Sequence, residues 1–130
     1  MGDNIALEVT DLRNGKRLFY APGLGEVGPQ ELEWMTGCDC LMVDGTFWTE
    51  DEMVRAGLGS KYAADMGHLP QSGTPERPGM MDALDKTRAH RKLLIHINNS
   101  NPILDEDGPE RGELSRQGIE VAFDGMQLEL

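Results

Sequence analysis

The sequence predicts a mixed α/β fold in which one sheet is backed by helices on one side. Two nearly continuous apolar runs, residues 38–43 and 92–97, predict buried strands, because a strand covered on both faces needs no polar alternation. Around them lie short segments that open with proline or acidic residues and close near glycine, a pattern typical of helices. Strands mixed with helices in this way favour a sheet carrying a helical layer.

Antiparallel hairpins are expected at both ends of the chain. Residues 4–10 alternate apolar and polar side chains, and Asn14-Gly15 precedes a second apolar run, which predicts a hairpin with a type I′ turn. At the other end, Asp124-Gly125 is expected to join residues 119–123 to residues 126–130 in a second hairpin. The class is therefore α/β or α+β.

Four helices are expected, over residues 29–35, 50–56, 80–86 and 109–117. The first and last begin at a proline and end beside a glycine, which is the usual asymmetry of helix ends. Residues 57–78 are expected to be mostly loop, because glycines interrupt them repeatedly. Loops should therefore form much of the surface near any site.

The composition excludes several classes of partner. The chain has 12 Lys and Arg against 23 Asp and Glu, a net charge of −11 and a pI near 4.5, so its surface repels nucleic acids and anionic membranes. No apolar run approaches the roughly 20 residues that cross a bilayer, and no secretory signal opens the sequence. We therefore expect a cytoplasmic protein without nucleic-acid or membrane partners.

The two cysteines, Cys38 and Cys40, are expected to be free and buried. Residues two apart on a strand point to the same side without the geometry of a disulfide. Two thiols alone also do not close a zinc site. The sequence therefore predicts no disulfide scaffold.

Polar side chains follow both predicted buried strands. Asp44 comes directly after the first strand, in a turn with Gly45 and Thr46, and His96 lies at the end of the second. Strand ends that open onto a crevice are where α/β sheets place their sites. The alternatives are an Asx-turn that merely closes a strand at Asp44 and a hydrogen-bonded core histidine at His96.

A second histidine, His68, lies in a loop between Gly67 and Pro70 that would present its ring. Taken alone, His68 is equally compatible with an idle, solvent-exposed side chain. Together with His96 and Asp44 it would supply part of a metal shell, because imidazoles and carboxylates are common metal ligands. Asn98 and Asn99 would then orient an imidazole or hold a polar substrate, the alternative being turn propensity.

Several separated stretches together resemble the coenzyme PQQ synthesis protein B family. The motifs occur in the right order, and the likeness extends along the whole chain. They include the Asp44 turn, the Gly67-His68 pair and the segment that begins at His96. The stretches are residues 2–5, 18–25, 43–48, 66–70, 93–106 and 118–126.

The resemblance implies a metallo-β-lactamase-like αββα sandwich with a metal site at one edge between its two sheets. It further implies that residues 1–130 are the C-terminal half of that domain, and that Met1 is a truncated or misassigned start. The family's His-x-His-x-Asp-His motif does not occur in the sequence. His68 and His96 correspond to superfamily metal ligands. No carboxylate stands where the bridging aspartate is expected, in residues 21–24, so two-metal hydrolysis is disfavoured.

The function implied by the resemblance is pyrroloquinoline quinone (PQQ) biosynthesis by a metal-dependent oxidoreductase. An iron-dependent oxygenase would hydroxylate the tyrosine of the Glu/Tyr precursor, with Fe²⁺ as the working metal, or Zn²⁺ in the protein as isolated. His68 and His96 would bind the metal, Asp44 would act as a supporting catalytic acid, and Asn98 and Asn99 would contact substrate.

A carrier is the alternative function, assisting transport of PQQ or its precursor to the periplasm. Other PQQ biosynthesis proteins are then expected partners, and a homodimer is compatible with either role. A third interpretation is that a chain of 130 residues is a fragment without activity of its own.

Overall fold

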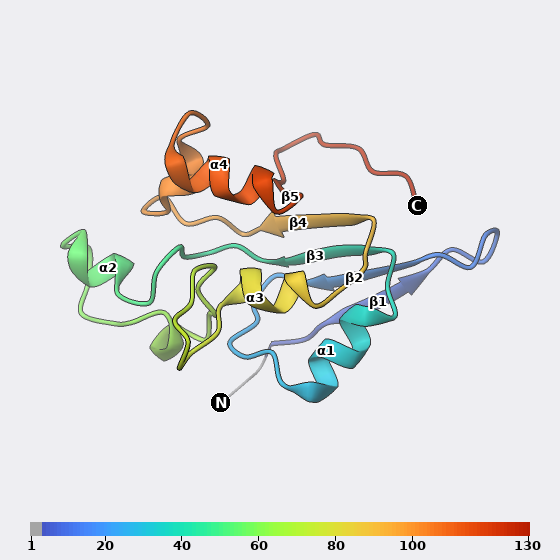
Figure 1. Ribbon diagram of the computed structural model, residues 1–130, viewed down its shortest axis with the longest axis horizontal. Helices are drawn as coiled ribbons and strands as arrows, with labels where there is room; N and C mark the ends of the chain where they lie inside the picture. The colour runs from blue at the N-terminus through green and yellow to red at the C-terminus, as the bar shows by residue number, and fades with distance from the viewer. Residues whose placement is uncertain (1–3) are drawn as a thin grey trace.

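Five strands form a single sheet in the order β1-β2-β3-β4-β5, in a computed structural model that describes residues 4–130. β1 and β2 are antiparallel, whereas β2, β3, β4 and β5 run parallel to one another (Figure 1). Residues 2 and 3 of the first family motif lie outside the described residues. The strands are β1 Leu7–Thr10, β2 Arg17–Ala21, β3 Cys40–Asp44, β4 Arg91–Ile95 and β5 Ile119–Val121.

Helical segments connect the parallel strands, because a parallel pair needs a crossover. α1 (Pro29–Thr36) joins β2 to β3, and α4 (Pro109–Arg116) joins β4 to β5. α2 (Glu52–Arg55), the 3₁₀ turn η1 (Ala64–Met66) and α3 (Met80–Asp85) lie between β3 and β4, and a second 3₁₀ turn η2 (Pro102–Leu104) precedes α4. In Figure 1 the segment after β3 gathers beyond the carboxyl ends of β3 and β4.

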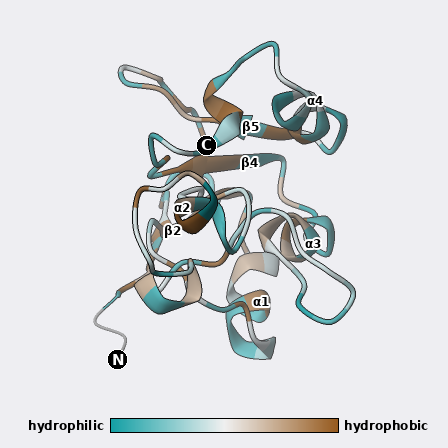
Figure 2. Cartoon of the chain, turned by 90° about the vertical axis from the view of Figure 1, so that its left-hand side faces the viewer, coloured by the Kyte–Doolittle hydropathy of each residue, from teal (hydrophilic) through white to brown (hydrophobic). Residues whose placement is uncertain are grey.

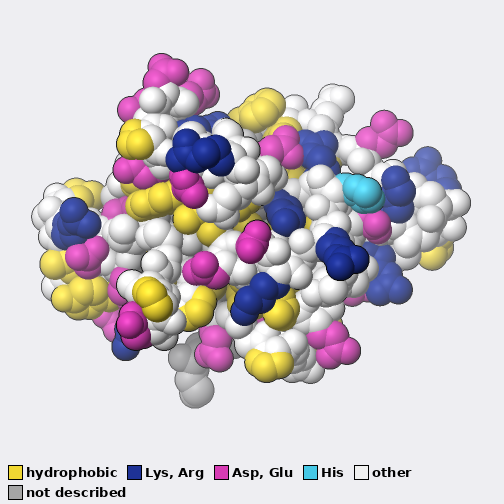
Figure 3. Space-filling view, in the orientation of Figure 1, with side chains coloured by type: hydrophobic (Ala, Val, Ile, Leu, Met, Phe, Trp, Pro, Cys, Tyr) yellow, Lys and Arg dark blue, Asp and Glu magenta, His cyan; other side chains and the backbone are white. Residues whose placement is uncertain are grey.

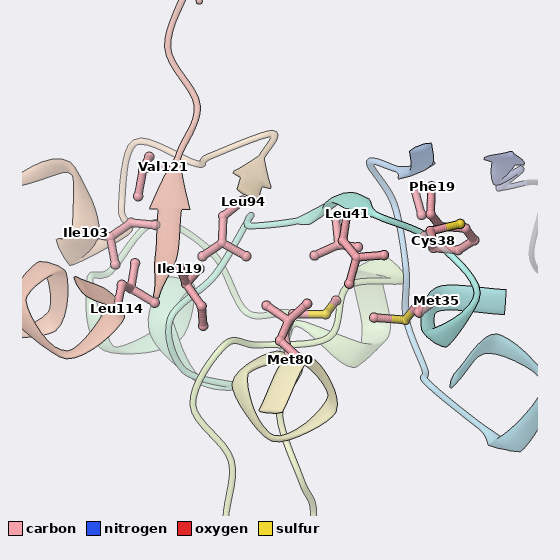
Figure 4. Close-up of a cluster of buried hydrophobic side chains, with 13 residues drawn as sticks. Phe19, Met35, Cys38, Leu41, Met80, Leu94, Ile103, Leu114, Ile119 and Val121 are labelled. Atoms are coloured by element: carbon pink, nitrogen blue, oxygen red, sulfur yellow. The ribbon is translucent and has the colours of Figure 1, made fainter. Parts of the chain in front are cut away.

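The hydrophobic core lies between the sheet and helices α1, α3 and α4. Alternate strand residues point toward these helices, as the period of two in a strand requires. Figure 4 shows the resulting cluster, and Figure 2 shows an apolar stretch in β4, whose last three residues are Leu93, Leu94 and Ile95. The buried members are Phe19, Ala21, Met35, Cys38, Leu41, Val43, Met80, Leu84, Leu94, Ile103, Leu114, Ile119 and Val121.

The sequence-based elements are largely confirmed, with small shifts at their ends. Three of the predicted helices shorten to the bounds given above, whereas the first extends by one residue to Thr36, and residues 57–78 are mostly loop with one 3₁₀ turn. The second buried strand ends at Ile95 rather than at residue 97, because His96 has a positive φ of 58° that leaves the strand conformation.

The N-terminal hairpin is confirmed, but its turn is longer than type I′. The amide of Asp11 donates to the carbonyl of Lys16 at 2.9 Å, so four residues lie between the closing pair. Gly15 has a φ of +74°, and its amide donates to the Asp11 carbonyl at 2.7 Å. The glycine is therefore needed in the turn, at a different position of a longer loop.

The predicted C-terminal hairpin is wrong. β5 pairs with β4 in parallel, and residues 126–130 form no strand. The Asp124-Gly125 turn does form, since Met126 donates to the Phe123 carbonyl at 3.0 Å. The chain then leaves β5, and the Leu130 carbonyl accepts a hydrogen bond from Asn14 Nδ2 at 3.1 Å. The Asp124-Gly125 pair thus forms the turn that its sequence predicts, but the residues that follow do not pair as a strand.

The structure shows how charged side chains are distributed on one face and where the two cysteines lie. In Figure 3 acidic side chains are scattered over the visible face among lysines and arginines, so the net charge does not gather there into one patch. Both cysteines are buried and free, as predicted. Within residues 4–130, no helix has both the length and the apolar character to span a membrane.

Candidate metal centre

Asp44 and His96 lie side by side because β3 and β4 are parallel and end at one edge of the sheet. Asp44 pairs with Ile95 in the register, which places the two turns that follow in contact. The amide of Gly45 donates to the Ile95 carbonyl at 2.7 Å. A Cβ on Gly45 would lie 2.5 Å from Ile97 Cδ1 and 2.7 Å from Leu94 Cβ, so only glycine allows this close approach.

The His96 ring reaches the site through an unusual backbone conformation. His96 is the one non-glycine residue of the described chain with a positive φ, and it is exposed. Such conformations persist where the surrounding structure enforces them, and they cluster at functional sites. The second interpretation of His96, a buried core histidine, is therefore wrong.

His68 arrives from the loop that follows η1. Gly67 takes a left-handed φ of +77°, and the amide of Leu69 then donates to the Leu24 carbonyl at 2.8 Å. The His68 ring stacks on His96 with 5.4 Å between centroids and meets the edge of Phe47 at 5.7 Å. His68 is thus held in place rather than idle in solvent.

The Asp44 carboxylate is completely buried and accepts hydrogen bonds at both oxygens. Oδ2 accepts from the Leu24 amide at 2.9 Å and lies 2.6 Å from His68 Nδ1. Oδ1 accepts from the Thr46 amide at 3.0 Å and from the Thr46 hydroxyl at 2.6 Å. The Asx-turn and the shared polar site predicted for Asp44 are therefore both present, since one oxygen closes the turn and the other contacts His68.

Thr46 is a site residue that the sequence reasoning missed. Its buried hydroxyl lies 2.8 Å from His96 Nδ1 and 3.1 Å from His68 Nδ1, in addition to its contact with Asp44. The available signal was its position in the same turn, two residues after Asp44. A threonine in a turn is too common for that signal to stand alone.

One group of three side chains could hold a metal ion. One ligand atom from each of Asp44, His68 and His96 lies within 4.8 Å of the others. Two imidazoles and a carboxylate suit Zn²⁺ or Fe²⁺, so the chemistry of the donors fits either ion. The structure therefore brings together all three predicted polar residues at the sheet edge.

The two predicted substrate-binding amides have different surroundings. The Asn98 side chain donates to Ser100 Oγ at 2.6 Å and contacts Met53 Sδ at 3.5 Å, so among the described residues its partners are not imidazoles. The Asn98 amide donates to the Thr46 carbonyl at 3.1 Å. Asn99 is exposed. Substrate contact by either side chain stays a prediction.

A buried amide pair supports the Asp44 turn from behind. Asn101 Nδ2 donates to the Gly45 carbonyl at 2.9 Å and to Gln71 Oε1 at 2.8 Å. Gln71 is itself completely buried and reaches the Asp44 carbonyl at 3.5 Å. These contacts connect the turn after β3 to the loops of residues 70 and 101. Asn101 also caps the turn η2, since its Oδ1 accepts from the Ile103 amide at 3.1 Å.

His68 also lines a cavity of about 660 Å³ next to the cluster. Its walls combine apolar side chains, including Leu69, with the cations Arg77 and Lys86 and the acid Glu50. Cavities of this size hold small ligands. The candidate metal centre is thus adjacent to a space that could admit a small molecule.

Comparison with known proteins gives a consistent family. Residues 1–97 match the model of the β-lactamase superfamily domain. The chain is 59% identical over 129 residues to coenzyme PQQ synthesis protein B of Pseudomonas fluorescens (strain SBW25), and 58% identical over 130 residues to that of Azoarcus sp. (strain BH72). Each match covers 99% of this chain and 42% of the relative, so the chain spans less than half the length of these curated relatives.

Solved structures agree with this result. Zn²⁺-bound PqqB from Methylobacterium extorquens superposes with a TM-score of 0.83 and 39% identity, over 90% of this chain and 41% of that one. A diphosphatase of the PhnP family has a TM-score of 0.53 at 16% identity, over 98% of this chain and 43% of that one, which shows a shared fold alone. The resemblance and the metallo-β-lactamase-like fold predicted from the sequence are confirmed.

Proposed function

The chain belongs to the β-lactamase superfamily, and from this premise we propose that it acts in PQQ biosynthesis through a divalent metal bound by His68 and His96. The relatives that match almost the whole chain bear the name of PQQ synthesis proteins. The observation that carries the proposal is the convergence of Asp44, His68 and His96 at the carboxyl edge of the sheet. The Zn²⁺-bound relative from Methylobacterium extorquens supports a metal role.

The finer proposal is an iron-dependent oxygenase that hydroxylates the tyrosine of a Glu/Tyr precursor. Bound Fe²⁺ supplies the activation of O₂, for which a site of imidazoles, a carboxylate and open positions is suited. The imidazoles of His68 and His96 hold the metal. Asp44 hydrogen-bonds to His68 Nδ1 at 2.6 Å and fixes the orientation of that ring.

The cavity beside His68 supports a substrate of this kind. Arg77 and Lys86 line it, and a Glu/Tyr unit carries carboxylates that can pair with cations. Apolar walls, including Leu69, would contact the aromatic ring. Asn98 and Asn99, on the loop after β4, are not among the residues that line this cavity, so their contact with substrate is a separate proposal.

Residues 1–130 are proposed to form the C-terminal half of the metal-binding domain. The cluster offers the imidazoles of His68 and His96 as ligands, with the Asp44 carboxylate beside them. The part of the relatives that lies outside the match would supply the others. Because affinity grows with the number of ligands, we expect this chain alone to bind metal weakly and to have little activity.

Metal titration tests the ligand assignment. We expect Zn²⁺ binding by calorimetry to weaken at least about 10-fold in His68→Ala and in His96→Ala, because each variant removes a ligand. His90→Ala is the matched control, since His90 is the third histidine of the chain and is exposed. Equal Zn²⁺ affinity in all three variants would refute the ligand assignment.

Incubation of the Fe²⁺-loaded protein with a Glu-Tyr dipeptide in air tests the reaction, with ascorbate added to supply the two electrons that reduce the second oxygen atom of O₂ to water. The proposal expects a product that has gained one oxygen atom, seen by mass spectrometry, with loss of this product in His96→Ala. A polypeptide that includes the relatives' remaining length should show the larger yield. Tight retention of the dipeptide without any mass change would contradict the oxygenase and support the carrier.

A further inference from the structure

We infer that Thr46 is a positioning residue whose hydroxyl holds His96 as the Nδ1–H tautomer, while Asp44 holds His68 in the same form, so that Nε2 of both rings is left free for a cation. This inference rests on the proposed metal-binding role of the two histidines. It assigns a function to a side chain at the centre of the cluster, within 3.1 Å of polar atoms on three neighbours.

The first step is the direction of the Thr46 hydroxyl. A hydroxyl has one proton to donate, and a carboxylate can only accept. Thr46 Oγ1 lies 2.6 Å from Asp44 Oδ1, which is the length of a charge-assisted O–H···O⁻ hydrogen bond. The hydroxyl proton of Thr46 is therefore committed to Asp44.

The second step fixes the proton on each ring. With its proton on Asp44, the Thr46 oxygen can only accept from His96 Nδ1 at 2.8 Å, so His96 carries a proton on Nδ1. His68 Nδ1 lies 2.6 Å from Asp44 Oδ2, which again can only accept, so His68 also carries a proton on Nδ1. The longer contact of 3.1 Å from His68 Nδ1 to Thr46 Oγ1 shares that same proton.

The chemical consequence concerns the opposite side of each ring. A neutral imidazole has one N–H, so Nε2 of both histidines keeps a free lone pair, which is the form that binds a metal. The two oxygens of Asp44 are already occupied by hydrogen bonds from Leu24, Thr46 and His68. Asp44 therefore orients the ligands instead of being one.

The backbone holds Thr46 where this arrangement requires it. The Thr46 carbonyl accepts from the Asn98 amide at 3.1 Å and from Asn101 Nδ2 at 3.3 Å. Thr46 is 4% exposed, so solvent does not compete for its hydroxyl. A ligand's outer hydrogen bond typically contributes 10- to 100-fold to metal affinity.

The direct test is the tautomeric state of the rings in the metal-free full chain. We would label histidine with ¹⁵N and record imidazole spectra at a mildly alkaline pH, where an ordinary imidazole is neutral. His68 and His96 should both show the Nδ1–H tautomer. His90, which is exposed, provides the reference for a ring in solvent. An Nε2–H tautomer of His96 in the unaltered protein would overturn the inference without any variant.

Variants at Thr46 test the cause. Thr46→Val keeps the shape but removes the hydroxyl, so His96 should move toward the tautomer mixture of His90, and Zn²⁺ affinity should fall about 10- to 100-fold. Thr46→Ser keeps the hydroxyl and should preserve both the Nδ1–H tautomer of His96 and the Zn²⁺ affinity. Circular dichroism checks that each variant is folded. An unchanged His96 tautomer in folded Thr46→Val would contradict the inference even if the histidines bind metal, whereas unchanged Zn²⁺ affinity in His96→Ala would contradict the metal role alone.

Discussion

Individual side chains in this protein are constrained by the buried partners around them. Asp44 is buried without a cationic lysine or arginine among its hydrogen-bond partners, and two backbone amides and the Thr46 hydroxyl satisfy it together with His68. An unsatisfied buried carboxylate would be strongly destabilising. The buried Asp44 carboxylate is therefore stabilised by these neighbouring donors, and it in turn orients the His68 ring.

Cys38 shows the effect of burial on a titratable group outside the site. Burial raises the pKa of its thiol to about 11, chiefly because the thiolate would be desolvated, with Glu8 adding repulsion. A raised thiol pKa favours the protonated form in the folded state. The contribution of the protonated Cys38 thiol to the free energy of unfolding is therefore complete below pH 9.0, and it is lost as the pH rises from 9.0 to about 11.

We predict that this pH dependence can be measured by urea unfolding. The protein should lose up to about 3 kcal/mol of stability over that window through Cys38, since the shift is about two pKa units and each corresponds to about 1.4 kcal/mol. Cys38→Ala should have a flatter profile than the unaltered chain above pH 9.0. Cys38 should also react slowly with iodoacetamide at that pH. Parallel profiles for the two proteins would show that the thiol does not titrate differently on folding.

At the scale of elements, the sequence predicted what is locally encoded. The apolar runs of β3 and β4 and the proline-first helices α1 and α4 follow from periodicity and end signals within each segment. The C-terminal hairpin failed because a turn signal cannot specify whether the chain beyond it finds an edge to pair with. β5 instead follows α4 and pairs with β4 in parallel.

The candidate site also combines residues whose positions follow from local sequence with residues whose positions depend on distant contacts. The strand-end rule placed Asp44 and His96 at one edge, because both positions depend on the neighbouring strands alone. His68 reaches this edge through a loop whose path depends on distant contacts, such as Leu69 to Leu24. His68 was indicated by its residue type, by its place in a loop between Gly67 and Pro70, and by the family resemblance. Thr46 was missed because its role exists only when both rings are in place.

At the scale of the whole molecule, the polar contacts behind the site tie together three distant segments. Asn101, next to η2, donates to the Gly45 carbonyl in the turn after β3 and to Gln71 in the loop before α3. Glu52 makes a similar connection, because its carboxylate accepts from the Trp48 amide at 2.9 Å and from Ser100 Oγ at 2.5 Å. Within residues 4–130, every buried side-chain nitrogen and oxygen has a hydrogen-bond partner.

Asn101→Ala tests whether this connection stabilises the fold and the site together. The variant leaves the Gly45 carbonyl and Gln71 Oε1 without their donor in a buried environment, so we expect a loss of about 2–3 kcal/mol of unfolding free energy in urea. Zn²⁺ affinity should fall as well, because the Asp44 turn loses its support. Asn99→Ala is the control, since Asn99 is exposed two residues away and its loss should change stability by less than about 0.5 kcal/mol. If both variants unfold at the same urea concentration, the buried amides of Asn101 and Gln71 do not join the loops energetically.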